Sequence, residues 1–156
     1  MLYAELYTGE SPASDANSHV LGGARYSFFF LELSDFLWGN FCSGAFRFPV
    51  EGETCIYLNS RGDRRSRTRQ LVQLIYGDIK PDRSIVRGQK VETMVKHVEY
   101  HSPQTKSDIL EDNDPLDSTI KLFKQLPNDS LLFAMGNQAG FGQDLIDQLM
   151  EFKSNG

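Results

Sequence analysis

Several patterns that would assign this chain to a function class at once are missing from its sequence. It has only two cysteines, Cys42 and Cys55, and they are too far apart for a CxxC metal pair. No HExxH pattern accompanies its three histidines, and no GxSxG is present, so we predict neither a metal site nor a nucleophile of the serine type. The phosphate-binding sequence GxxxxGK[ST] is also absent. Catalytic residues are therefore not expected in this chain alone.

Positive charge and long apolar runs are scarce as well. The net charge of -5 and the pI near 5.2 argue against general nucleic-acid binding, which favours a basic domain. The most apolar stretch, 26–41, contains Glu32 and Asp35 and is too short and too polar to span a bilayer. It either packs in the core as a strand and helix or contacts a partner or a membrane surface. Few thiols and no secretory signal predict a cytoplasmic protein.

Alternating apolar segments dominate the second part of the chain. Short β-branched runs predict strands, and apolar residues at helical spacing predict the helices between them. This order indicates an α/β domain with a mostly parallel sheet over 53–156, preceded by a separate segment, 1–52, whose first 24 residues we expect to be mostly a poorly ordered lead-in. The predicted strands are 54–58, 84–87, 109–110 and 130–135, and the predicted helices are 64–76 (ended by Gly77 and Pro81), 91–100, one capped by Asp114 with Pro115 at its first position, and 141–153.

Two polar loops follow the first and last of these strands. They are N-S-R-G-D-R at 59–64 and M-G-N-Q-A-G-F-G at 135–142. The carboxyl ends of parallel strands meet at one edge of the sheet, where open α/β domains bind their ligands. The two loops are therefore the candidate binding site.

The later loop is rich in glycine. Gly136, Gly140 and Gly142 lie between a buried strand and a helix, and Asn137 adds side-chain donors. Glycine permits tight turns and close backbone approach, and a helix N-terminus attracts a phosphate or a carboxylate. The same pattern also occurs in turns that are purely structural, and the sequence leaves both interpretations open.

The earlier loop opens a cluster of five arginines within 61–69. Arginine presents a planar fork of donors that suits carboxylates and phosphates. Arg61 and Asp63 leave the strand end, and Asp63 either caps the next helix or orients Arg61 or Arg64 through an ion pair. The remaining arginines are predicted to form a solvated helix face. A nucleic-acid contact through 64–69 is a further interpretation, which the net charge disfavours.

The sequence N-S-R-G-D-R-R-S-R-T-R-Q at 59–70 resembles the N-x-R-x-D-R-x-x-R-T-x-Q pattern in the C-terminal domain of the poly-γ-glutamate synthetases. These capsule-type amide ligases are related to the Mur ligases. The ending L-L-F-A-M-G-N-Q-A-G-F-G-Q-D-L-I-D-Q-L-M-E-F at 131–152 resembles the last strand, turn and helix of the same family, and I-V-R-G-Q-K-V-E-T-M-V-K-H at 85–97 resembles a strand and helix between them. The resemblance covers about 53–153.

This resemblance implies a three-layer Rossmann-like domain, as in Mur ligase C-terminal domains. It implies an ATP- and Mg²⁺-dependent ligase that converts a carboxylate to an acyl phosphate, which the amino group of glutamate attacks to extend a poly-γ-glutamate-type chain. Binding of substrate or nucleotide would fall to eight residues of the two loops. They are Asn59, Arg61, Asp63, Arg64, Gly136, Asn137, Gly140 and Gly142.

The chain departs from the family by lacking the central P-loop domain. We therefore expect no activity from the chain alone and a P-loop ligase domain or subunit as its partner. Membrane-embedded capsule proteins are further partners that the family implies, and through them a membrane association. The alternative is a non-catalytic regulatory module of the same fold that binds an anion or a nucleotide.

Overall fold

The fold was analysed in a computed structural model, which describes residues 18–21, 24–31, 51–100, 102–137 and 140–154. Within these residues, six strands form one sheet in the order β1-β2-β6-β3-β4-β5, in which β1 is antiparallel to its neighbour β2 and the other pairs are parallel. The strands are β1 (Ser18–Leu21), β2 (Ala24–Leu31), β3 (Thr54–Asn59), β4 (Arg83–Arg87), β5 (Lys106–Leu110) and β6 (Ser130–Gly136). The predicted α/β fold with a mostly parallel sheet is confirmed.

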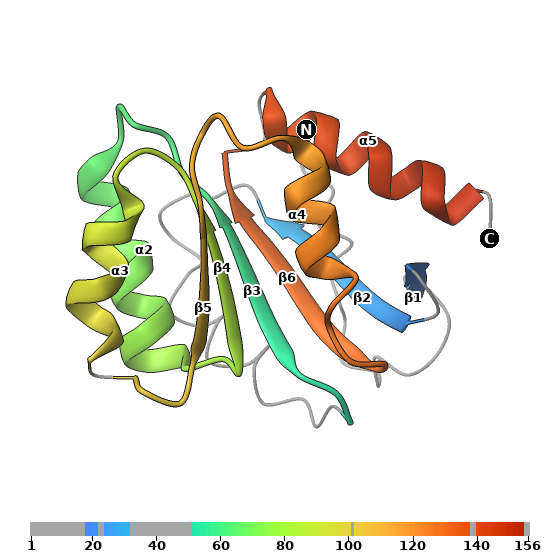
Figure 1. The fold of residues 1–156 in the computed structure, drawn as a ribbon, viewed down its shortest axis with the longest axis horizontal. Helices are drawn as coiled ribbons and strands as arrows, with labels where there is room; N and C mark the ends of the chain where they lie inside the picture. The colour runs from blue at the N-terminus through green and yellow to red at the C-terminus, as the bar shows by residue number, and fades with distance from the viewer. Residues whose placement is uncertain (1–17, 22–23, 32–50, 101, 138–139, 155–156) are drawn as a thin grey trace.

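Helices cover both faces of the sheet, as Figure 1 shows. One face carries α2 (Arg65–Leu74), its π-helical extension η1 (Ile75–Ile79) and α3 (Val91–Glu99). The other face carries α4 (Leu116–Phe123) and α5 (Phe141–Ser154). Successive side chains of a strand point to opposite faces, so the central strands contribute to both cores and read as continuous apolar runs. In β3, Ile56 and Leu58 pack beneath α2 and α3, whereas Cys55 and Tyr57 pack beneath α4.

The structure corrects several predicted boundaries. Residues 18–21 form β1 instead of belonging to the lead-in. Gly77 does not end the helix predicted at 64–76, because α2 continues through it as η1. The helical segment ends at Lys80, which has a left-handed φ of 52° and precedes Pro81. Asp114 is not a cap, since the N-cap of α4 is Pro115, and the Asp114 carboxylate instead accepts a hydrogen bond from the amide of Glu111.

The N-terminal segment takes part in the same sheet. Strand β2 pairs in parallel with β6, from Tyr26 opposite Ser130 to Leu31 opposite Met135. The first part of the aromatic stretch 26–41 is therefore a strand, while 32–41 lies outside the described residues, as does Cys42. The division of the chain at residue 52 stays a prediction.

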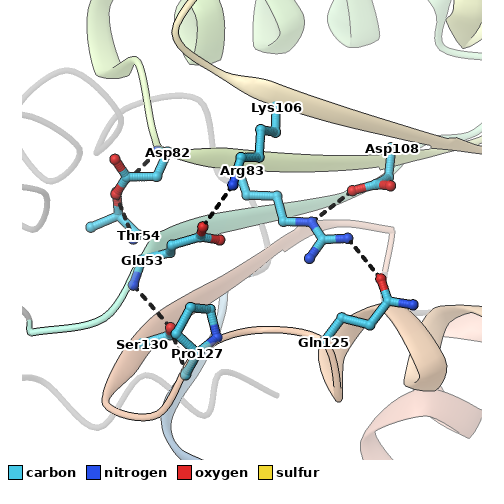
Figure 2. A network of polar contacts seen from close by, with 9 residues as sticks. All are labelled: Glu53, Thr54, Asp82, Arg83, Lys106, Asp108, Gln125, Pro127 and Ser130. Carbon is cyan, nitrogen blue, oxygen red and sulfur yellow. Dashed lines mark hydrogen bonds and ion pairs between the residues drawn. The ribbon is translucent and has the colours of Figure 1, made fainter.

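A network of polar side chains ties the amino ends of the strands together (Figure 2). In it, Arg83 Nε donates to Asp108 Oδ2 at 2.7 Å, and Arg83 Nη2 donates to Gln125 Oε1 at 3.2 Å. Each remaining member also has a partner in the network. The other bonds join Thr54 to Asp82, Lys106 to Glu53, the Glu53 amide to the Ser130 hydroxyl, and that hydroxyl to the Pro127 carbonyl.

Candidate functional site

The two predicted loops lie side by side at the carboxyl edge of the sheet, because β3 and β6 are neighbouring parallel strands with Asn59 opposite Gly136. Asn59 joins them directly. Its side-chain Nδ2 donates to the Asn137 carbonyl at 2.7 Å, and its own carbonyl accepts from the Asn137 amide at 2.8 Å. Asn59 is only 5% exposed. Its position makes it the link between the loops, with little surface left to present to a ligand.

Glycine allows the two loops to approach so closely. Gly136 has a φ of +113°, and a Cβ at this position would lie 2.1 Å from the Asn59 carbonyl oxygen. At Gly142, a Cβ would lie 2.4 Å from the Asn137 carbonyl oxygen. Both glycines are therefore required by backbone packing within the site. Gly140 differs, because it is exposed and nothing lies within 4 Å of where its Cβ would be.

The arginines of the first loop are at the surface of this edge. Arg61 forms a two-point ion pair with Asp63, in which Nε and Nη2 donate to the two carboxylate oxygens at 2.9 and 2.8 Å. Their side chains are 44% and 57% exposed, so the pair orients Arg61 while leaving part of its fork accessible. The alternative role of Asp63 as a helix cap is wrong, because the N-cap of α2 is Arg64 and no side chain caps it. The Arg64 side chain is exposed beside this pair.

A further arginine at this edge was not predicted from the sequence. Arg87 ends β4, is 2% exposed, and has no carboxylate partner among the described residues. Its Nη2 donates to the carbonyls of Asp112 and Asp114, the latter at 2.8 Å. Its guanidinium carbon lies 3.5 Å from the centre of the Phe141 ring, a cation–π contact. Arg87 thus fixes the loop after β5 and the start of α5, which follows the glycine loop.

Other buried polar groups lie near Arg87 on the same face of the sheet. Within the described part of the chain, Arg87 Nη1 is buried without a hydrogen-bond partner, and the buried hydroxyls of Tyr57 and Thr119 interact with each other. Burial raises the pKa of the Tyr57 phenol, and the charge of Arg87 opposes that rise. The sequence signal for this cluster is an arginine and a tyrosine at strand positions in phase with apolar residues, two positions after Ile85 and Cys55.

Among the residues that the structure describes, no group of three or more His, Cys, Asp or Glu side chains is placed to hold a metal ion. Over the same residues, no helix combines the length and the apolar character needed to cross a bilayer.

Comparison with known proteins identifies the family. The family model of the poly-gamma-glutamate synthase CapB C-terminal domain matches residues 40–152, which is most of the chain and includes both loops. Searches of curated proteins and of solved structures found no match. The match begins before β3 and ends within α5, so it spans the carboxyl edge described above. The chain therefore belongs to the poly-gamma-glutamate synthase CapB C-terminal domain family.

Proposed function

We propose that this chain is the C-terminal domain of an ATP-dependent amide ligase that adds glutamate to a growing poly-γ-glutamate-type chain. The observation that carries the proposal is the Asn59–Asn137 link, which sets the arginine loop beside the glycine loop at one sheet edge. Family membership supports the polymer, and the relation of the poly-γ-glutamate synthetases to the Mur ligases, which the sequence resemblance implies, supports the reaction.

The charge of the loop suits such a reaction. Amide formation through an acyl phosphate brings carboxylate and phosphate oxygens together, and charge-assisted bonds from fixed donors stabilise that arrangement. Arg61 is held by Asp63 before any ligand arrives, so little side-chain freedom remains to be lost on binding. Arg64 offers a second exposed guanidinium next to it.

ATP and Mg²⁺ would supply the activation of the carboxylate. No P-loop sequence occurs in this chain, so a P-loop ligase domain or subunit would hold most of the nucleotide. Arg61 and Arg64 have the donor chemistry to reach phosphate oxygens or the carboxylate of the incoming glutamate across the domain boundary. We place this assembly in the cytoplasm, with membrane-embedded capsule proteins as further partners and no role for nucleic acid.

The test combines this chain with the P-loop portion of a poly-γ-glutamate synthase and measures phosphate release that depends on both ATP and glutamate. We expect turnover from the assembly and none from the chain alone. Arg61→Ala should lower kcat/KM about tenfold to a hundredfold, the cost of one charge-assisted bond of about 1.5–3 kcal/mol. Asp63→Asn should lower it less, because the guanidinium remains but loses its orientation.

The matched control removes a positive charge from the opposite edge of the sheet. Lys106 pairs with Glu53 at 3.1 Å and its side chain is 73% exposed, so Lys106→Ala should leave turnover unchanged. Equal activity in Arg61→Ala and Lys106→Ala would remove Arg61 from the site. Ligand binding by the chain with no turnover in any assembly would instead identify a non-catalytic anion- or nucleotide-binding module.

A further inference from the structure

Outside the candidate site, α2 and α3 enclose a groove of about 350 Å³ on the outer surface of the domain. Val72 and Met94 form its apolar floor, and none of the residues that line it is acidic. Its polar rim has two residues from each helix. They are Arg69 and Gln73 of α2 and Thr93 and His97 of α3.

This groove is continuous with the candidate site through a row of side chains on α2. Residues four apart lie on the same side of a helix, so Arg65, Arg69 and Gln73 form one exposed row. The helix begins just after β3, so the row leads from the carboxyl edge of the sheet along the groove for roughly 12 Å. Neither Arg65 nor Arg69 has an ion-pair partner among the described residues.

We propose that this row and groove bind the γ-linked polyglutamate chain itself, as a track that holds the polymer next to the site of elongation. The proposal rests on the proposed function for the identity of the polymer. Each unit of such a chain presents one carboxylate, one amide and two methylene groups. Arg65, Arg69 and His97 suit the carboxylates, Gln73 and Thr93 suit the amides, and the apolar floor suits the methylenes.

Charge complementarity favours a polyanion over other occupants of this groove. The chain as a whole is acidic, with a net charge of -5, so the exposed arginines make this flank of α2 more favourable to a polyanion than the average surface. The acidic Glu92 of α3 is paired with Lys96, and both lie outside the groove. An extended acidic chain is therefore attracted to one flank of α2 and not to the surface in general.

The experiment titrates the full chain into a fluorescently labelled oligomer of about ten γ-linked glutamates and follows anisotropy at two salt concentrations. We expect the affinity for the oligomer to weaken with salt. It should fall about tenfold in the double variant Arg65→Ala/Arg69→Ala, which can no longer form two exposed ion pairs with carboxylates of the oligomer. Lys96→Ala, which removes a positive charge outside the groove, should bind as the unaltered chain does. An α-linked glutamate oligomer of the same length should bind several times more weakly, because its carboxylates and amides are spaced differently.

Three results would overturn the proposal. They are no binding by the unaltered chain, equal binding by the double variant, and an equal loss in Lys96→Ala. Equal affinity for the α-linked oligomer would overturn the assignment to a γ-linked chain. Oligomer binding is measured without nucleotide or P-loop partner, so its outcome is separate from that of the ligation assay on Arg61.

Discussion

Strand β4 begins with Arg83 and ends with Arg87, and these two arginines have different kinds of partner. Arg83, at the amino end, pairs with the Asp108 carboxylate and with Gln125 in a network whose members all have partners (Figure 2). Arg87, at the carboxyl end, is more deeply buried, yet it is held by backbone carbonyls and an aromatic ring. One of its nitrogens has no partner among the described residues.

This difference separates the amino edge of the sheet from the carboxyl edge, where we propose that ligands bind. At the amino ends, the polar side chains of the network bond to one another and so tie neighbouring strands together. At the carboxyl ends, the loops are held by close backbone packing and by Arg87 from beneath, which leaves the exposed guanidinium groups of Arg61 and Arg64 available. Substitutions at the two edges should therefore affect stability and activity in different proportions.

The largest effect should come from breaking the backbone contact at the carboxyl edge. Gly136→Ala places a Cβ 2.1 Å from the Asn59 carbonyl oxygen at a φ of +113°, and no rotamer can relieve this clash. We expect a loss of about 4 kcal/mol in the free energy of unfolding, or no folded protein, measured by urea denaturation.

Gly140→Ala is the matched control in the same loop. Its φ of +66° is also left-handed, but nothing lies within 4 Å of the new Cβ, so only the backbone strain of about 1 kcal/mol is expected. Equal losses in the two variants would show that the close approach of β3 and β6 does not hold this edge.

The second prediction compares the two arginines of β4. Arg87→Ala removes two hydrogen bonds and a ring contact from a fully buried position, and we expect a loss of about 3 kcal/mol. Arg83→Ala breaks a partly buried ion pair, and we expect about 2 kcal/mol.

Hydrogen exchange locates the damage in each variant. Faster exchange in 111–114 and in the first turn of α5 is expected for Arg87→Ala, and faster exchange in β5 for Arg83→Ala. If Arg87→Ala left the exchange of α5 unchanged, Arg87 would not be the residue that positions the glycine loop.

The sequence predicted the features that depend on local pattern. The continuous apolar run of β6 and the helical spacing of Phe141, Leu145 and Leu149 are properties of neighbouring residues, and the structure confirms both elements. The meeting of the two loops was also predictable, because parallel strands place their carboxyl ends together.

What the sequence did not reveal depends on distant partners. Asp63 fits a cap and an ion pair equally well in sequence, and only the position of Arg61 decides between them. Arg87 resembles any strand-ending arginine until Phe141 and the 111–114 loop are placed around it. The polar network at the amino ends contains residues from five separate segments of the chain. A local sequence pattern cannot predict such bonds, because the partners are far apart in the sequence.

The last prediction concerns the interior between the two edges, where β3 places Cys55 and Tyr57 on the α4 side. Burial raises the pKa of the Cys55 thiol and of the Tyr57 phenol, so both groups keep their protons in the folded chain. Unfolding releases them to ordinary pKa values of about 8.5 and 10. Their contribution to stability is therefore complete below about pH 8.5 and is lost as the pH rises above it.

We expect the free energy of unfolding to fall by about 1.4 kcal/mol per pH unit once the first group titrates in the unfolded chain. Urea denaturation between pH 7 and pH 10.5, in a Cys42→Ser background, measures this slope. Cys55→Ala should flatten it between about pH 8.5 and pH 10, and Tyr57→Phe should act only above about pH 10. If Cys55→Ala left the slope of the free energy of unfolding against pH unchanged, water would reach the thiol in the folded chain. The amino half of β3 would then be as exposed to water as the carboxyl edge.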